Sequence, residues 1–159
     1  MRFCAACLSF LTYAATVMGA PSGPAVGSTA PDFYAHNLLS GETIPLSSQH
    51  GKVVLLAFWN SRCGSCRREL PLLEKAQTLF GQNTLAVFAV SFPEDPGAPS
   101  AIKKMASTWQ IDLIEDHDGT IASRYAIATI PQLFIIGPDG KVLANNVGYG
   151  DVSHDSPHR

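Results

Sequence analysis

Two apolar runs on either side of a helix-forming stretch constrain the fold of this chain more than any other feature. Residues 53–59 (VVLLAFW) and 84–91 (TLAVFAVS) contain no charged side chain, which is typical of strands buried on both faces. Between them, apolar residues recur at helical spacing as far as Phe80, and Gly81 provides a stop signal. Parallel strands need a long crossover connection, so this order predicts a βαβ unit and an α/β fold.

The segments around this unit complete the predicted fold. Short strand-forming runs with central turn signals predict one hairpin at 32–46 and another at 130–148. Helices are expected at 101–110 and 118–125, with a short strand or extended link at 111–116 between them. The chain has 159 residues, of which 46% are apolar and 15% charged, so one globular domain is expected. We therefore predict a mixed central sheet of about four or five strands, with an N-terminal β-hairpin and helices on both faces.

The N-terminus has the pattern of an export signal. Arg2 supplies a positive charge, residues 3–18 are uncharged and mostly apolar or small, and two small residues follow at 19–20. This order predicts a signal peptide over residues 1–20. The alternative is an uncleaved signal anchor, although the apolar stretch is short for a spanning helix. Either form places the rest of the chain outside the cytoplasm, in the periplasm.

Composition divides the remainder of the chain into three parts. Residues 21–29 form a linker of small and turn-forming residues, 30–150 form the predicted domain, and 151–159 form a polar tail that is expected to be disordered. The formal net charge is −2 and the basic residues are scattered, so we expect no nucleic acid partner. We also expect a monomer.

The cysteines point to chemistry rather than to a structural framework. Of the four in the chain, Cys4 and Cys7 lie in the predicted leader, so the domain retains only Cys63 and Cys66. One close pair encloses a loop too small to remove much entropy from the unfolded chain, so a disulfide there adds little to the stability of the fold. Redox exchange is the better use of this spacing.

Both cysteines fall where the first buried strand ends and the helix begins. A helix N-terminus has unpaired N–H groups and a partial positive charge, which favour a thiolate over a thiol. Arg62, Arg67 and Arg68 add positive charge, although solvent screens much of it. We expect Cys63 to be the exposed attacking sulfur and Cys66, one turn deeper, to resolve the mixed disulfide.

Two other uses of the cysteine pair stay open. The pair could be a structural disulfide, or it could form half of a metal site. A zinc site would need about four ligands, and none of the five histidines lies near the motif in the sequence. We therefore expect a dithiol that undergoes exchange, with no metal and no cofactor.

Three stretches together resemble the thioredoxin superfamily, in its extracytoplasmic TlpA/ResA-like branch: APDF at 30–33, GKVVLLAFWNSRCGSCRRELP at 51–71 and TIPQLFIIGPDGKVL at 129–143. The resemblance covers Ala30 to Gly148. It implies a thioredoxin-like fold and a thiol–disulfide oxidoreductase. Members of this branch are exported reductants that keep protein cysteines reduced, including those of apocytochrome c. The resemblance thus implies protein thiols and disulfides as partners, and a membrane or periplasmic electron donor.

The resemblance also assigns roles to individual positions. Cys63 and Cys66 match the redox pair, and Pro131 matches a cis-proline that faces this pair. The backbone of Ile130 would then be available to pair with an extended substrate segment. The simpler alternative for Pro131 is a turn between a loop and a strand. Arg62, next to the first cysteine, is expected to contact substrate as well.

A carboxylate for proton transfer is implied in the segment VSFPED. There, Glu94 aligns with a proton-transfer glutamate of the ResA-like branch. A desolvated carboxylate has a raised pKa, which suits proton exchange with the buried Cys66 thiol. The alternative is a solvated loop glutamate, and Asp95 is the second candidate for the role.

Three positions depart from the family pattern. Ala57 replaces an aspartate of thioredoxin, Arg62 replaces the usual tryptophan, and Ser65 replaces the usual proline. Residues beside and between the cysteines influence the stability of the thiolate and therefore the reduction potential. The direction of exchange stays open, because the resemblance favours a reductant whereas these replacements favour a more oxidising protein.

Three other functions remain as alternatives. A peroxiredoxin shares the fold but would have a threonine in place of Asn60. A Sco-type chaperone could bind Cu(I) through two thiolates, but its cysteines are one residue further apart and its histidine ligand has no match in the setting of His117. An interaction module without catalysis is the last alternative. We interpret the chain as an exported thiol–disulfide oxidoreductase that reduces protein disulfides.

Overall fold

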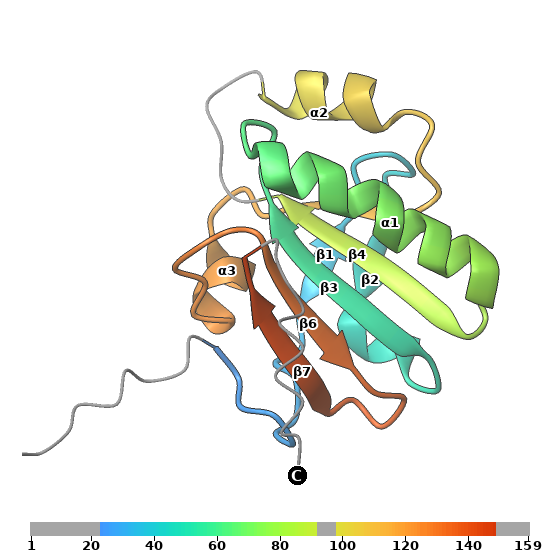
Figure 1. The fold of residues 1–159 in the computed structure, drawn as a ribbon, viewed down its shortest axis with the longest axis vertical. Coiled ribbons are helices and arrows are strands. Elements are labelled where there is room, and N and C mark those ends of the chain that lie inside the picture. The colour runs from blue at the N-terminus through green and yellow to red at the C-terminus, as the bar shows by residue number, and fades with distance from the viewer. Residues whose placement is uncertain (1–22, 92–97, 149–159) are drawn as a thin grey trace, which may run out of the picture.

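The computed structural model describes residues 23–91 and 98–148, and its centre is a five-stranded sheet. The strands are β3 (Val53–Trp59), β4 (Leu85–Ser91), β5 (Asp112–Glu115), β6 (Gln132–Ile136) and β7 (Val142–Val147). They lie in the order β5–β4–β3–β6–β7 (Figure 1). Strands β3, β4 and β5 run parallel, whereas β6 is antiparallel to both β3 and β7. The sheet is therefore mixed, as the sequence predicted.

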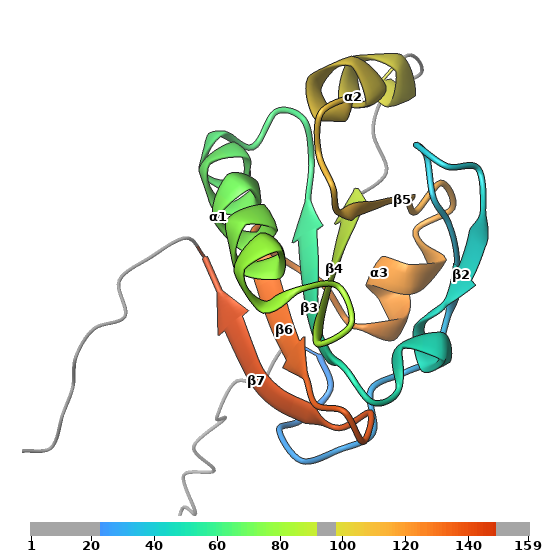
Figure 2. The ribbon, with the colours of Figure 1, turned by 90° about the vertical axis from the view of Figure 1, so that its right-hand side faces the viewer.

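The remaining elements cover this sheet. The helices are α1 (Gly64–Phe80), α2 (Ala98–Ala106) and α3 (Thr120–Arg124), and a short 3₁₀ helix spans Leu46–Gln49. The predicted N-terminal hairpin is formed by β1 (Tyr34–His36) and β2 (Thr43–Pro45). Figure 2 shows α1 on one side of the sheet and α3 with the hairpin on the other. This arrangement confirms the predicted α/β, thioredoxin-like fold with helices on both faces.

The central strands are apolar along their whole length because each face packs on a separate core. Leu56 and Phe58 of β3 belong to the core that is shared with β1 and α3. Ala57 and Trp59 belong to the core that is shared with α1 and α2. All four side chains are buried, and successive residues of a strand point to opposite faces. No position in β3 or β4 therefore calls for a polar residue except the last, Ser91, whose hydroxyl donates to the Ile114 carbonyl.

The mixed topology brings two distant segments together at one edge of the sheet. Strand β3 ends at Trp59, immediately before the cysteine motif and α1. Because β6 runs antiparallel to β3, its first residue Gln132 pairs with Phe58, next to that same end. Residues 126–131, which precede β6, thus approach the cysteine motif although about sixty residues separate them in sequence.

Two boundaries differ from the expected ones. Helix α2 spans Ala98–Ala106 rather than 101–110, and α3 spans Thr120–Arg124 within the expected 118–125. The expected link at 111–116 contains β5, the edge strand next to β4. The predicted leader (1–20) and the predicted tail (151–159) lie outside the described residues. Among the described residues, no helix is both long and apolar enough to cross a membrane.

Candidate active site

Cys63 and Cys66 are joined by a disulfide at the N-terminus of α1. Their sulfurs are 2.04 Å apart and their Cα atoms 5.3 Å apart. Cys63 is the N-cap residue of α1 in an extended conformation, so the helix begins between the two cysteines. A tight turn leads from β3 into this position, in which the Asn60 carbonyl accepts the Cys63 N–H at 3.2 Å. The Asn60 side chain also accepts the Arg62 N–H at 3.1 Å, which fixes the turn from a second side.

The two sulfurs differ in accessibility. Cys66 is fully buried within the core beneath α1, whereas Cys63 is half-buried. The Cys63 sulfur accepts the backbone N–H of Cys66 at 3.1 Å and lies 3.3 Å from the Ser65 hydroxyl. After reduction, the same two groups are placed to stabilise a thiolate on Cys63, because a charged acceptor gains more from a hydrogen bond than a neutral one.

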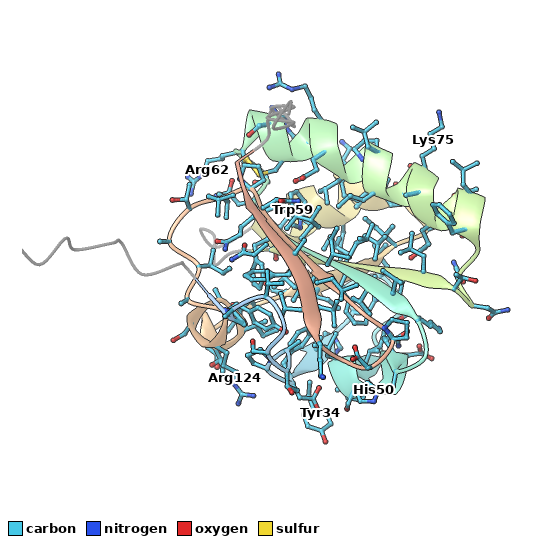
Figure 3. The ribbon with its side chains drawn as sticks, turned by 60° about the horizontal axis from the view of Figure 1, so that its bottom comes forward. Tyr34, His50, Trp59, Arg62, Lys75 and Arg124 are labelled. Atoms are coloured by element: carbon cyan, nitrogen blue, oxygen red, sulfur yellow. A yellow bond between two sulfur atoms is a disulfide. The ribbon has the colours of Figure 1, made fainter. Side chains whose placement is uncertain are left out.

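Positive charge surrounds the accessible sulfur. Arg62, Arg67 and Arg68 are all exposed in this region. Figure 3 shows the disulfide beside Arg62, at the end of α1. The unpaired N–H groups of the first helical turn add to the same field. The combined effect favours an anionic sulfur at Cys63, although solvent screens the contribution of the exposed guanidinium groups.

The segment before β6 forms the second side of the site. The peptide bond between Ile130 and Pro131 is cis. Pro131 is buried, and its carbonyl accepts the Gly148 N–H at 2.8 Å. Ile130 is half-buried and packs against both cores. The assignment of these two residues to substrate positioning stays a prediction.

Trp59 packs in the core on which the cysteine motif rests. Its side chain is 1% exposed, belongs to the same core as Cys66, and packs against Trp109 with 5.8 Å between the ring centroids. The indole N–H has no hydrogen-bond partner among the residues that the structure describes. Trp59 is therefore a core residue.

Glu94, the carboxylate expected near Cys66, and the second candidate Asp95 both lie outside the described residues. Ala57, which replaces an aspartate of thioredoxin, is fully buried and packs in the core beneath α1. Among the described residues, a different carboxylate lies close to Cys66 in α1. It is Glu69, one helical turn after Cys66. Glu69 is half-buried, and desolvation by burial raises its pKa above the ordinary value.

Reasoning from the sequence missed Glu69, although one signal was available. Residues three apart on a helix are neighbours on its surface, so a helix that begins at Gly64 places Glu69 beside Cys66. The helical spacing does not predict the partial burial of Glu69, because that burial depends on the packing of α1 on the sheet. His117 is exposed and lies in the turn ahead of α3. Within 23–91 and 98–148, no group of three or more His, Cys, Asp or Glu side chains could hold a metal ion.

Comparison with known proteins places this geometry among thiol–disulfide enzymes. The model of the AhpC/TSA family matches residues 26–145. The thioredoxin-like protein YneN of Bacillus subtilis is 34% identical over 124 residues, which are 77% of this chain and 71% of that protein. The thiol-disulfide oxidoreductase ResA of Geobacillus thermodenitrificans is 31% identical over 121 residues, which are 74% of this chain and 67% of ResA.

A solved structure gives the same likeness in three dimensions. It is the crystal structure of a protein from Chlorobium tepidum described as a thiol:disulfide interchange protein DsbE. Its TM-score is 0.70 at 31% sequence identity, and the match covers 79% of this chain and 87% of that one. A match over 79% of this chain extends well beyond the cysteine motif.

Proposed function

Because the chain belongs to the AhpC/TSA family and resembles ResA and DsbE within it, we propose that it reduces disulfides of exported proteins through Cys63 and Cys66. As a thiol–disulfide oxidoreductase it exchanges disulfides with protein substrates. The observation that carries the proposal is the unequal burial of the two sulfurs, which leaves Cys63 open to a partner and keeps Cys66 beneath it. Apocytochrome c is one candidate substrate, and a membrane or periplasmic protein is the candidate electron donor.

The proposed reaction proceeds in two exchanges. In the reduced enzyme, the Cys63 thiolate attacks one sulfur of the substrate disulfide, so a mixed disulfide forms and one substrate thiolate leaves. The Cys66 thiolate then attacks the Cys63 sulfur, which restores the Cys63–Cys66 bond and releases the second substrate thiolate. Two electrons pass from the enzyme dithiol to the substrate. The electron donor, itself a dithiol, reduces the enzyme disulfide again by the reverse sequence.

Cys66 must lose its proton inside an apolar core before the second exchange. A carboxylate with a raised pKa, one helical turn away, is a suitable acceptor for that proton. We assign this role to Glu69 among the described residues, while Glu94 stays a prediction for the same task. Under this proposal the carboxylate works only in its ionised form, so the rate of the second exchange rises as pH passes upward through the raised Glu69 pKa.

We expect Glu69→Gln to slow the second exchange and to remove that rise from the pH–rate profile. The sign of the accompanying stability change is also fixed. A raised pKa means that the folded state favours the protonated acid, so the stability that Glu69 contributes is lost as pH rises above the ordinary glutamate pKa of 4.5. The amide variant should therefore gain stability relative to wild type over the same pH range. Stopped-flow measurement of the second exchange, with urea unfolding at matched pH, tests both expectations.

Glu42→Gln is the matched control, because Glu42 is an exposed carboxylate on the N-terminal hairpin. It should leave the pH–rate profile of the second exchange unchanged. An unaltered pH–rate profile in Glu69→Gln would remove Glu69 from the mechanism and return the role to Glu94.

The direction of exchange is measurable as a reduction potential. We propose a reductant, in keeping with the TlpA/ResA resemblance, and we expect the Cys63–Cys66 couple to equilibrate with glutathione near −270 mV, the value for thioredoxin, rather than near −120 mV, the value for DsbA. Reduction of insulin disulfides by the dithiol form is the accompanying activity. A potential near the upper value, together with no insulin reduction, would make the protein an oxidant.

The same assays separate the rival functions. A peroxiredoxin would consume hydrogen peroxide with Cys63 as its reactive thiol, but Asn60 occupies the place of the threonine that such an enzyme uses. A copper chaperone would bind Cu(I) with one-to-one stoichiometry and show no exchange. Either result without insulin reduction would replace the proposed activity.

The location follows from the N-terminal sequence and from the nature of the reaction. Residues 1–20 have the pattern of an export signal, and a reductant of protein disulfides has its substrates where disulfides form. We propose that the domain works outside the cytoplasm, either released by cleavage or held by the uncleaved segment.

A further inference from the structure

The indole N–H of Trp59 is a buried hydrogen-bond donor that has no acceptor while the disulfide is intact. The side chain is 1% exposed, and its Nε1 atom has no hydrogen-bond partner within residues 23–91 and 98–148. A buried donor in this state costs free energy, and proteins seldom retain one without a use. This donor lies in the core that also contains Cys66, so the redox reaction is the first place to look for its use.

Trp59 and Cys66 lie at about the same height above the start of β3, on the same face of the sheet. The Gln77 side chain of α1 accepts the Val87 N–H at 2.8 Å, and Val87 pairs with Leu55, so this bond fixes the position of α1 along β3. From Gln77 back to Cys66 the helix rises about 16 Å. From Leu55 forward to Trp59 the strand rises about 13 Å, toward the same end of the sheet. The two residues thus differ in height by only about 3 Å, and Figure 3 shows Trp59 close to the end of α1 that carries the disulfide.

The sulfur of Cys66 is the acceptor that this core offers to the indole. Apart from the cysteines and Trp109, the core consists of leucine, isoleucine, valine and alanine side chains, and the Trp109 indole is itself only a donor. The other sulfur, that of Cys63, already accepts the Cys66 N–H and lies beside the Ser65 hydroxyl. A neutral sulfur is a weak acceptor, whereas a charged acceptor forms a much stronger hydrogen bond.

We propose that the Trp59 indole N–H donates a hydrogen bond to the Cys66 thiolate when that thiolate forms during disulfide exchange. The inference rests on the proposed dithiol reaction, to which it adds a donor. Glu69 takes the proton of the Cys66 thiol, and the indole N–H stabilises the negative charge that stays on the sulfur. The sulfur then attacks Cys63, the substrate thiolate leaves with the charge, and the N–H is again without an acceptor in the disulfide form.

Trp59→Phe keeps an aromatic ring in the core and removes the donor. In the reduced full chain, we expect Cys66 to ionise about one pH unit higher than in the wild type, the size expected for a hydrogen bond to a charged acceptor. The second exchange at neutral pH should slow by about three- to tenfold, because fewer molecules carry the thiolate although each thiolate is more nucleophilic. The Cβ signal of Cys66 in an NMR titration gives the ionisation, and single-turnover kinetics give the rate.

A role of Trp59 in packing alone predicts the opposite sign. A smaller ring leaves space for water in the core, and better solvation makes a buried thiol easier to ionise. Trp109→Phe is the matched control, because Trp109 is the other member of the aromatic pair, with 5.8 Å between the ring centroids. This control should leave the ionisation of Cys66 and the rate of the second exchange unchanged.

The indole N–H can also be observed directly. The chain contains two tryptophans, so its NMR spectrum has two indole N–H signals, which the two phenylalanine variants assign. We expect the Trp59 signal to move downfield as Cys66 ionises, with the same midpoint pH. A Trp59 signal without this step overturns the inference, as does a Trp59→Phe protein in which Cys66 ionises at or below the wild-type pH. Neither result bears on insulin reduction by the wild type, which tests the proposed function separately.

Discussion

Cys63→Ser is expected to reduce disulfide exchange to the uncatalysed background, whereas Cys66→Ser should still attack substrate and should accumulate mixed disulfides with it. The difference follows from the burial of the two sulfurs, because only Cys63 is accessible to a partner while Cys66 lies fully inside the core. Without Cys66, the second exchange has no nucleophile and the covalent intermediate persists. Insulin reduction measures the first loss, and non-reducing electrophoresis with mass spectrometry detects the trapped species.

Ser65→Ala is the matched control for these variants. It removes the hydroxyl 3.3 Å from the Cys63 sulfur but keeps both sulfurs and the Cys66 N–H that donates to Cys63. We expect a modest rise in the Cys63 pKa and slower exchange, with no trapped intermediate. Wild-type insulin reduction by Cys63→Ser would refute the proposed chemistry, as would a mixed disulfide that accumulates through Cys66 in that variant.

Trp59→Ala is expected to lower the free energy of unfolding by about 3–5 kcal/mol, the usual range for removing a large aromatic side chain from a core. Trp59 is 1% exposed and fills the space between β3, Trp109 and the core beneath α1. The cavity would lie in the core that also contains Cys66, so we also expect the N-terminus of α1 to lose order and exchange to slow. Urea unfolding of the oxidised protein, monitored by circular dichroism, gives the energy.

Trp59→Phe separates packing from the indole N–H. Phenylalanine keeps an aromatic ring in the core and removes a buried N–H that has no partner among the described residues. An unsatisfied buried donor carries a desolvation cost. Removing that donor therefore offsets part of the stability that is lost with the smaller contact area. We expect the phenylalanine variant to be markedly more stable than Trp59→Ala. Equal destabilisation by both substitutions would contradict this account of how the Trp59 side chain contributes to stability.

The sheet could be predicted from the sequence because its central strands face two cores. An unbroken apolar run leaves few alternatives to a buried strand, and β3 and β4 were located within one residue of their ends. The cysteine pair was equally informative, because the boundary between an apolar strand and an amphipathic helix fixes where the helix N-terminus lies. Both predictions depend on local patterns, and the comparisons with ResA and DsbE agree with them.

Contacts between distant segments explain what the sequence did not predict. Helix α2 includes Pro99 in its first turn, where the missing N–H costs nothing, so a proline that looks like a loop residue is a helix residue. The helix ends at Ala106, and α1 holds the following link: Gln77 donates to the Gln110 carbonyl at 2.6 Å, and Glu74 accepts the Gln110 N–H at 2.7 Å. No periodicity in 101–110 encodes these tertiary bonds. The burial of Glu69 likewise depends on tertiary packing and not on a local pattern.

The antiparallel course of β6 against β3 divides the enzyme's two tasks between separate stretches of polypeptide. The reactive sulfurs belong to the turn that follows β3, whereas the surface that we propose to receive a client comes from the chain ahead of β6. Substitutions in 126–130 could thus retune which proteins are accepted while the redox couple keeps its potential. Substitutions at Gly64 or Ser65 could shift that potential while recognition is preserved. One scaffold of this topology is therefore able to serve different clients and different electron donors by independent changes.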